Sequence, residues 1–179
     1  MIDEKHMLRA LELSLKGSPS PNPYVGAVLV KGERILGEGF HRKAGCPHAE
    51  VEALNSAGDC RGATLYVSLE PCSHEGRTPA CTDAIINAGV SRVVYAADDP
   101  TPKVRGREEL LEAGVEVLGG VLEGRARKIN EVFYHNTITG KPFVVLKAAL
   151  TLDGKIATEA GESKWITTRK SREYAHKLR

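Results

Sequence analysis

The sequence is short of aromatic residues, of net charge and of long apolar runs, and each shortage argues against a class of protein. Aromatic residues make up 5% of the 179 residues, too few to form an obvious stacking platform for bases. The formal net charge is +2, and the basic residues are scattered rather than gathered in a stripe. No apolar run reaches the roughly 18 residues of a membrane span. We therefore expect neither a nucleic acid nor a membrane as a partner.

Cysteine is scarce as well, at positions 46, 60, 72 and 81. A chain of this length can build a hydrophobic core without disulfides. The first five residues, Met1 to Lys5, lead into an amphipathic pattern and do not resemble a signal peptide. We therefore expect a reduced, cytoplasmic protein.

Hydrophobic periodicity predicts strands that alternate with helices after an initial hairpin. The predicted helices span residues 3–16, 48–57, 80–88, 108–113 and 122–137, and the predicted strands span 24–30, 34–40, 64–69, 90–97 and 115–118. This order predicts an α/β fold, a three-layer α/β/α sandwich on a mixed sheet.

The character of the chain changes at Lys141-Pro142, which divides it into a domain of residues 1–141 and a second segment of residues 142–179. The second segment opens with a predicted strand over 143–150 and continues as a polar tail. Fewer than about 40 residues do not close a core alone. We expect an incomplete second domain that packs on the first, pairs with another chain or is partly disordered, and this favours a homodimer.

A cluster of potential metal ligands dominates the first domain. His48 and Cys81 each stand at the predicted start of a helix, where Pro47 is expected at the first helical position, and Cys72 lies in the loop between them. Positive helix N-termini favour the thiolate forms of both cysteines. Three protein ligands and an open position are typical of catalytic zinc. Hence His48, Cys72 and Cys81 are predicted to bind Zn²⁺.

Glu50 stands two residues after the predicted histidine ligand and is assigned a catalytic role. We expect it to take a proton from zinc-bound water and to deliver protons to a ring nitrogen and to the leaving amine. The zinc nucleobase deaminases carry the same signature, His-x-Glu followed by Pro-Cys-x-x-Cys, whereas here eight residues separate the cysteines. A structural zinc site with Cys46 as the fourth ligand is the alternative.

The run from Glu70 to Cys81, EPCSHEGRTPAC, closely resembles the deaminase domain of the bifunctional riboflavin-biosynthesis deaminase–reductase family. The runs over 21–26, 41–45 and 48–50, together with Asp99-Pro100, agree with it. The resemblance implies a cytidine-deaminase-like fold and hydrolytic deamination of 2,5-diamino-6-ribosylamino-4(3H)-pyrimidinone 5′-phosphate, with zinc-bound hydroxide as the nucleophile. Residues 143–157 and 163–167 resemble the opening of the family's reductase domain, and from these residues alone we expect neither NADPH binding nor reductase activity.

The resemblance also implies a set of substrate contacts. They are Asn22, His41, His74, Arg77, Asp99 and Thr101. The sequence departs from the family where Thr101 replaces an asparagine and where Gly106-Arg107-Glu108 interrupts a Gly-x-Gly pattern. Binding of the ribose phosphate is therefore the part of the site that the sequence alters most.

Two other functions share these ligands. A deaminase of cytidine, guanine or tRNA adenosine would use the same zinc core, although the scarcity of aromatic residues argues against a nucleic-acid substrate. A catalytically silent zinc-binding interaction module would keep the metal but lack activity.

Overall fold

The computed structural model describes residues 2–74 and 79–178. The chain divides into two compact units, Met1–Pro142 and Phe143–Arg179. The elements of the first unit follow one another as α1 (Ile2–Ser14), β1 (Gly26–Lys31), β2 (Arg34–Phe40), α2 (Ala49–Ser56), β3 (Thr64–Val67), α3 (Cys81–Asn87), β4 (Arg92–Tyr95), α4 (Gly106–Glu112), β5 (Glu116–Leu118), α5 (Glu123–Ile129) and α6 (Glu131–Thr139). Among the described residues, no helix combines the length and the apolar character that crossing a membrane requires.

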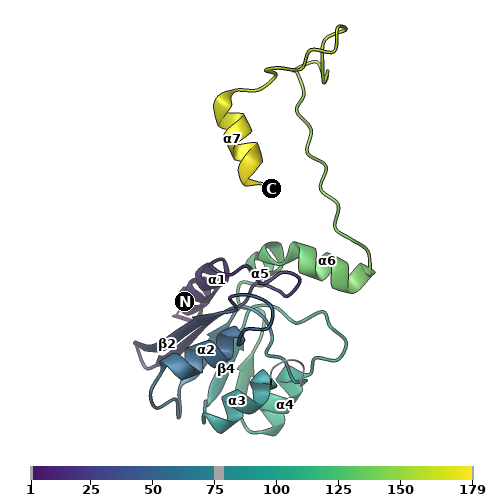
Figure 1. Ribbon diagram of the computed structural model, residues 1–179. Helices are drawn as coiled ribbons and strands as arrows, with labels where there is room; N and C mark the ends of the chain where they lie inside the picture. The colour runs from purple at the N-terminus through teal and green to yellow at the C-terminus, as the bar shows by residue number, and fades with distance from the viewer. Residues whose placement is uncertain (1, 75–78, 179) are drawn as a thin grey trace. The chain divides into compact units, whose positions relative to one another are not determined.

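The first unit is built on a five-stranded mixed sheet in the order β2-β1-β3-β4-β5. Strand β1 pairs antiparallel with β2 and with β3, whereas β3, β4 and β5 run parallel. Helices α2, α3 and α4 cover one face of the sheet, and α1 and α5 lie on the other (Figure 1). The predicted three-layer α/β/α sandwich is confirmed.

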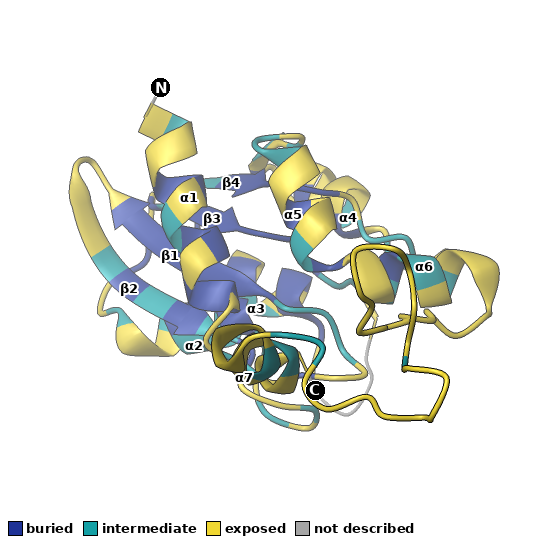
Figure 2. Ribbon diagram, turned by 90° about the horizontal axis from the view of Figure 1, so that it is seen from above, coloured by how far each residue is buried: buried dark blue, intermediate teal, exposed yellow. Residues whose placement is uncertain are grey.

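The sheet is the centre of the hydrophobic core. Residues 26–30 of β1 and residues 65–67 of β3 are all buried (Figure 2), as expected for strands with helices on both faces. Apolar side chains of α1, with Met7 fully buried, complete the core on one side. The site therefore stands on a rigid platform, because the strands that lead to it are fixed on both faces.

Two glycines of β2 let α2 lie close to the sheet. A side-chain carbon at Gly39 would stand 2.2 Å from the carbonyl oxygen of Ala49, and one at Gly37 would stand 2.2 Å from that of Ala53. Both distances are shorter than any van der Waals contact, so only glycine permits this approach of helix and strand. The close packing fixes the N-terminal end of α2.

Replacing Gly39 with alanine is expected to push α2 away from β2. Overpacking against backbone atoms costs roughly 1–3 kcal/mol of unfolding free energy, and the shift of α2 should also weaken metal binding at its first turn. Urea denaturation and metal titration measure both effects. The Gly58→Ala control, at an exposed glycine with open space around it, should change stability by less than about 0.5 kcal/mol. Equal losses in the two variants would contradict the account.

The predicted helix over 122–137 is wrong in one respect, since the structure divides it into α5 and α6 at Asn130. The backbone of Asn130 leaves the helical region, with φ −104° and ψ 21°. Its side-chain amide pairs with the backbone of Tyr24, accepting from the Tyr24 N–H (2.7 Å) and donating to the Tyr24 carbonyl (2.9 Å). This long-range pairing competes with continuation of the helix, and no local pattern reveals it.

The described residues of the second unit form one helix, α7 (Arg169–Lys177), where the sequence predicted only a polar tail. The side chain of Thr168 caps it by accepting from the backbone N–H of Ser171. The predicted strand over 143–150 is wrong, because these residues have no regular structure and are exposed. A strand needs a partner for its backbone groups, and the described part of this unit contains no other strand.

Candidate metal centre and active site

The three predicted metal ligands come from separate elements. His48 is the N-cap residue of α2, with an extended backbone (φ −74°, ψ 162°), and Cys81 is the first residue of α3. Cys72 lies in the loop that follows β3. Pro47 precedes the N-cap and so does not occupy the predicted first helical position, which belongs to Ala49.

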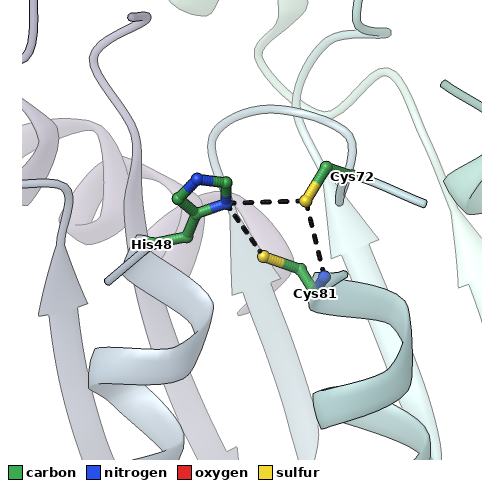
Figure 3. A group of neighbouring side chains, drawn as sticks. All are labelled: His48, Cys72 and Cys81. Atoms are coloured by element: carbon green, nitrogen blue, oxygen red, sulfur yellow. Dashed lines mark hydrogen bonds between the residues drawn. The ribbon is translucent and has the colours of Figure 1, made fainter. Parts of the chain in front are cut away.

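The three side chains point toward one another (Figure 3). The Nδ1 atom of His48 lies 3.2 Å from the Sγ of Cys81 and 3.5 Å from the Sγ of Cys72, and all three ligand atoms lie within 4.8 Å of one another. A tetrahedral zinc ion with bonds of about 2.0–2.3 Å holds such atoms roughly 3.5–3.8 Å apart. The arrangement therefore fits zinc, and Nδ1 is the histidine atom that faces the metal position.

The cysteines of this cluster are free thiols, as are Cys46 and Cys60. No described residue beyond His48, Cys72 and Cys81 belongs to the metal-ligating group, so Cys46 is not the fourth ligand that a structural site would need. A centre with three protein ligands retains a coordination position for water or substrate.

Hydrogen bonding shifts the pKa values of the two cysteines in opposite directions. Hydrogen bonds from the Cys81 side chain and from His48 lower the pKa of Cys72, and the backbone N–H of Cys81 also donates to the Cys72 sulfur (3.4 Å). The pKa of Cys81 is raised, first because its thiol bonds to Cys72 and then because it is buried. A dication between the sulfurs favours deprotonation of both.

Glu50 lies in the first turn of α2 and is 3% exposed. Because α2 begins at Ala49, His48 and Glu50 both lie at the helix tip, as the two-residue spacing required. Burial first, and the charge of Cys72 second, raise the pKa of Glu50 to about 7. A carboxyl group of this pKa can both accept and release a proton near neutral pH.

A cavity of about 400 Å³ adjoins the candidate metal centre. His48, Cys72 and Glu50 line it together with five of the six predicted substrate contacts, namely Asn22, His41, His74, Asp99 and Thr101. The sixth, Arg77, lies outside the described residues. The structure thus gathers segments from across the first unit around one cavity of a size usual for small-molecule sites.

His41 is buried and has a protein partner at each ring nitrogen. Its Nδ1 lies 3.1 Å from the carbonyl oxygen of Pro47, to which it donates, so its Nε2 accepts from the side-chain amide of Asn22 (3.0 Å). Burial lowers the pKa of His41, consistent with a neutral ring. This arrangement orients the Asn22 amide at the cavity wall.

The loop after β4 supplies two further predicted contacts, Asp99 and Thr101, whereas His74 lies in the loop after β3. The Asp99 carboxylate accepts the backbone N–H of Thr101 (2.8 Å), and burial raises the pKa of Asp99. Glu70, at the opposite side of this loop, accepts backbone N–H groups from Asp99 and Arg107. Burial raises the pKa of Glu70, and these two hydrogen bonds oppose the shift.

Sequence reasoning assigned no role to several residues of the cavity wall. Among them are Val25, Leu69, Glu70 and Phe133. Glu70 stood inside the recognised run, but its partners lie about 30 residues away. Phe133 reaches the cavity from α6, and no pattern in the sequence links that helix to the metal ligands.

The comparisons with known proteins agree with this site. The family model of the cytidine and deoxycytidylate deaminase zinc-binding region matches residues 1–97, and the model of the RibD C-terminal domain matches residues 142–179. The chain is 55% identical over 183 residues to the riboflavin biosynthesis protein RibD of Aquifex aeolicus, covering 99% of this chain and 51% of that protein. It is 49% identical over 184 residues to RibD of Escherichia coli, covering 100% and 50%.

Solved structures show the same relationship. The diaminohydroxyphosphoribosylaminopyrimidine deaminase/5-amino-6-(5-phosphoribosylamino)uracil reductase of Thermotoga maritima superposes with a TM-score of 0.94 at 50% identity, over 99% of this chain and 52% of that one. The dCMP deaminase of cyanophage S-TIM5 has a TM-score of 0.55 at 28% identity, over 66% and 96%. The chain spans about half the length of the curated RibD relatives. It belongs to the cytidine and deoxycytidylate deaminase zinc-binding family, and its resemblance to the riboflavin-biosynthesis deaminase–reductases extends over its whole length.

Proposed function

We propose that this chain hydrolytically deaminates 2,5-diamino-6-ribosylamino-4(3H)-pyrimidinone 5′-phosphate in riboflavin biosynthesis. The products are 5-amino-6-ribosylaminouracil 5′-phosphate and ammonia. The observation that carries the proposal is the convergence of His48 Nδ1, the two cysteine sulfurs and the Glu50 carboxyl at one cavity. The likeness to RibD proteins at about 50% identity supports the choice of substrate.

The chemistry divides between a metal and a proton carrier. When bound by His48, Cys72 and Cys81, zinc supplies a Lewis acid that brings the pKa of a water ligand toward 7. Glu50 takes a proton from water at a carboxylate oxygen. It gives this proton to the ring nitrogen. It then takes the second proton of that water, from the hydroxyl group added to the ring carbon, and passes it to the departing amine, which leaves as ammonia. Because Glu50 is buried beside the ligands rather than among them, its carboxyl group remains available for this transfer.

The walls of the cavity hold the substrate in this proposal. Asn22 offers its amide to the polar edge of the pyrimidine, and His41 contributes by fixing that amide. Asp99, Thr101 and His74 are assigned to the ribose phosphate side, together with Arg77. The hydroxyl of Thr101 serves as a donor where the family has an asparagine amide.

Ammonia release tests the proposal directly. The zinc-loaded chain is assayed with the diaminopyrimidine ribotide, cytidine, guanine and a tRNA anticodon stem-loop. We expect turnover of the ribotide alone. Turnover of cytidine but not of the ribotide would reassign the substrate, and no turnover of any of the four, by a chain that retains zinc, would favour a silent zinc-binding module.

The remaining proposals concern the setting of the enzyme. Four free cysteines support a reducing, cytoplasmic location. Exposed apolar side chains in the second unit, such as Val144, Leu146 and Leu152, support association into a homodimer, which light scattering of the purified chain measures. No NADPH-dependent reductase activity is assigned to residues 142–179.

A further inference from the structure

Glu70 joins the end of β3 to the end of β4. Its carboxylate accepts the backbone N–H of Asp99 at Oε2 (3.2 Å) and that of Arg107 at Oε1 (3.0 Å). Its own backbone N–H donates to the carbonyl oxygen of Ala97 (2.9 Å). Both carboxylate oxygens are therefore bonded to the segment that carries Asp99, although Glu70 stands only two residues before Cys72.

Neighbouring contacts join the same two segments. The hydroxyl of Ser73 accepts the backbone N–H of Arg105 (2.8 Å). A side-chain carbon at Gly106 would lie 1.9 Å from the carbonyl oxygen of Pro71, so the start of α4 packs directly on the backbone beside Cys72. The stretch from Glu70 to Ser73 thus contains a metal ligand, Cys72, and also makes hydrogen bonds to both ends of the loop that carries Asp99.

We propose that Glu70 is a positioning residue that sets the distance between the metal centre and the substrate contacts Asp99 and Thr101. This inference rests on the proposed deaminase function. Glu70 acts through Asp99, whose backbone it holds and whose carboxylate in turn holds the N–H of Thr101. With the loop fixed, the ribose phosphate is bound at one distance from the metal, so the carbon that bears the amine lies over it.

A carboxylate suits this role better than an amide does. Two N–H donors approach two oxygens, and an ionised carboxylate offers an acceptor to each. Glutamine has the same shape but would turn an NH₂ group toward one of the donors. Glu70→Gln therefore removes one hydrogen bond and places the NH₂ group against a backbone N–H, so that two donors face each other. The volume of the side chain stays unchanged.

Steady-state kinetics of Glu70→Gln with the ribotide test the inference. We expect KM to rise about tenfold while kcat stays within about threefold of the original value, because the loop would bind substrate less well while the metal centre is intact. Zinc content should remain at the level of the unmodified chain. The matched control is Glu112→Gln, which removes the same charge from an exposed position at the end of α4 and should leave KM unchanged.

A KM that does not change would overturn the inference. So would a loss of zinc that accounts for the loss of activity, because Glu70 would then support the metal ligands rather than the substrate loop. If Glu70→Gln does not fold, Ser73→Ala removes the Arg105 contact instead and should raise KM about threefold, and an unchanged KM in this variant has the same contrary meaning.

Amide hydrogen exchange separates this inference from the proposed function. In Glu70→Gln at least one of the N–H groups of Asp99 and Arg107, the one that faces the glutamine NH₂, should exchange at least tenfold faster, whereas those of β3 should keep their protection. An unmodified chain that fails to deaminate the ribotide would refute the proposed function and leave this measurement intact. Unchanged exchange at both Asp99 and Arg107 would refute the positioning role of Glu70 even if the ribotide is a substrate.

Discussion

Replacing Cys81 with alanine is expected to abolish deaminase activity together with zinc binding. Cys81 is fully buried at the start of α3, with its sulfur 3.2 Å from the His48 Nδ1, and alanine leaves only two protein ligands. A two-ligand site holds zinc far more weakly than a three-ligand site. Residual turnover should fall below about 0.1%, since the reaction would lack its Lewis acid. Plasma mass spectrometry of the dialysed variant and ammonia release measure the two effects.

The matched control for this variant is Cys46→Ala. Cys46 also lines the cavity, but it is absent from the metal-ligating group. The control should keep its zinc and most of its activity. Zinc loss in Cys46→Ala would show that Cys46 is a ligand after all, and retention of zinc in Cys81→Ala would remove Cys81 from the coordination sphere.

Glu50→Gln is expected to lower kcat by about 10³- to 10⁴-fold while zinc content stays unchanged. The glutamine side chain keeps the shape of the buried glutamate but cannot carry a proton between water and the leaving amine, and general acid–base catalysis supplies roughly this factor. KM for the ribotide should change little, because Glu50 is assigned to proton transfer rather than to binding. Rapid-quench kinetics and metal analysis of the same sample measure these quantities.

Glu52→Gln is the control on the same helix. Glu52 forms an ion pair with Arg42 (3.3 Å) and has no assigned part in the reaction, so kcat should remain within about twofold, since surface ion pairs contribute little. If Glu50→Gln lost zinc along with activity, Glu50 would be a metal ligand. If it kept its activity, the proton would be carried by another group.

Much of the first unit could be predicted because its elements carry local signals. The continuous apolar run of β1, the glycine turn between β1 and β2 and the helical period of α1 all lie within short windows of sequence. The break at Asn130 could not be predicted in this way, since it depends on a pairing with Tyr24 more than 100 residues away. The strand predicted over 143–150 failed for a related reason, because apolar residues favour a strand only where another strand pairs with it.

Some residues of the candidate site could also be assigned from the sequence, and others could not. The metal ligands and Glu50 could be predicted because their chemistry restricts residue type and spacing. His48, Glu50 and Cys81 also stand at helix starts. Glu70 and Phe133 could not be assigned, since their relation to the site depends on how β3, β4 and α6 pack. For His41, the residue was recognised as part of the site, but only the structure shows that both of its ring nitrogens are bonded to the protein.

X-ray absorption at the zinc edge tests the central claim most directly. For the purified chain we expect a first coordination shell of two sulfur atoms at about 2.3 Å and two nitrogen or oxygen atoms at about 2.0–2.1 Å, from one histidine and one exchangeable ligand. A shell without sulfur, a shell of three or more sulfurs, or a folded chain that takes up no zinc would contradict the assignment of His48, Cys72 and Cys81 as a catalytic metal centre.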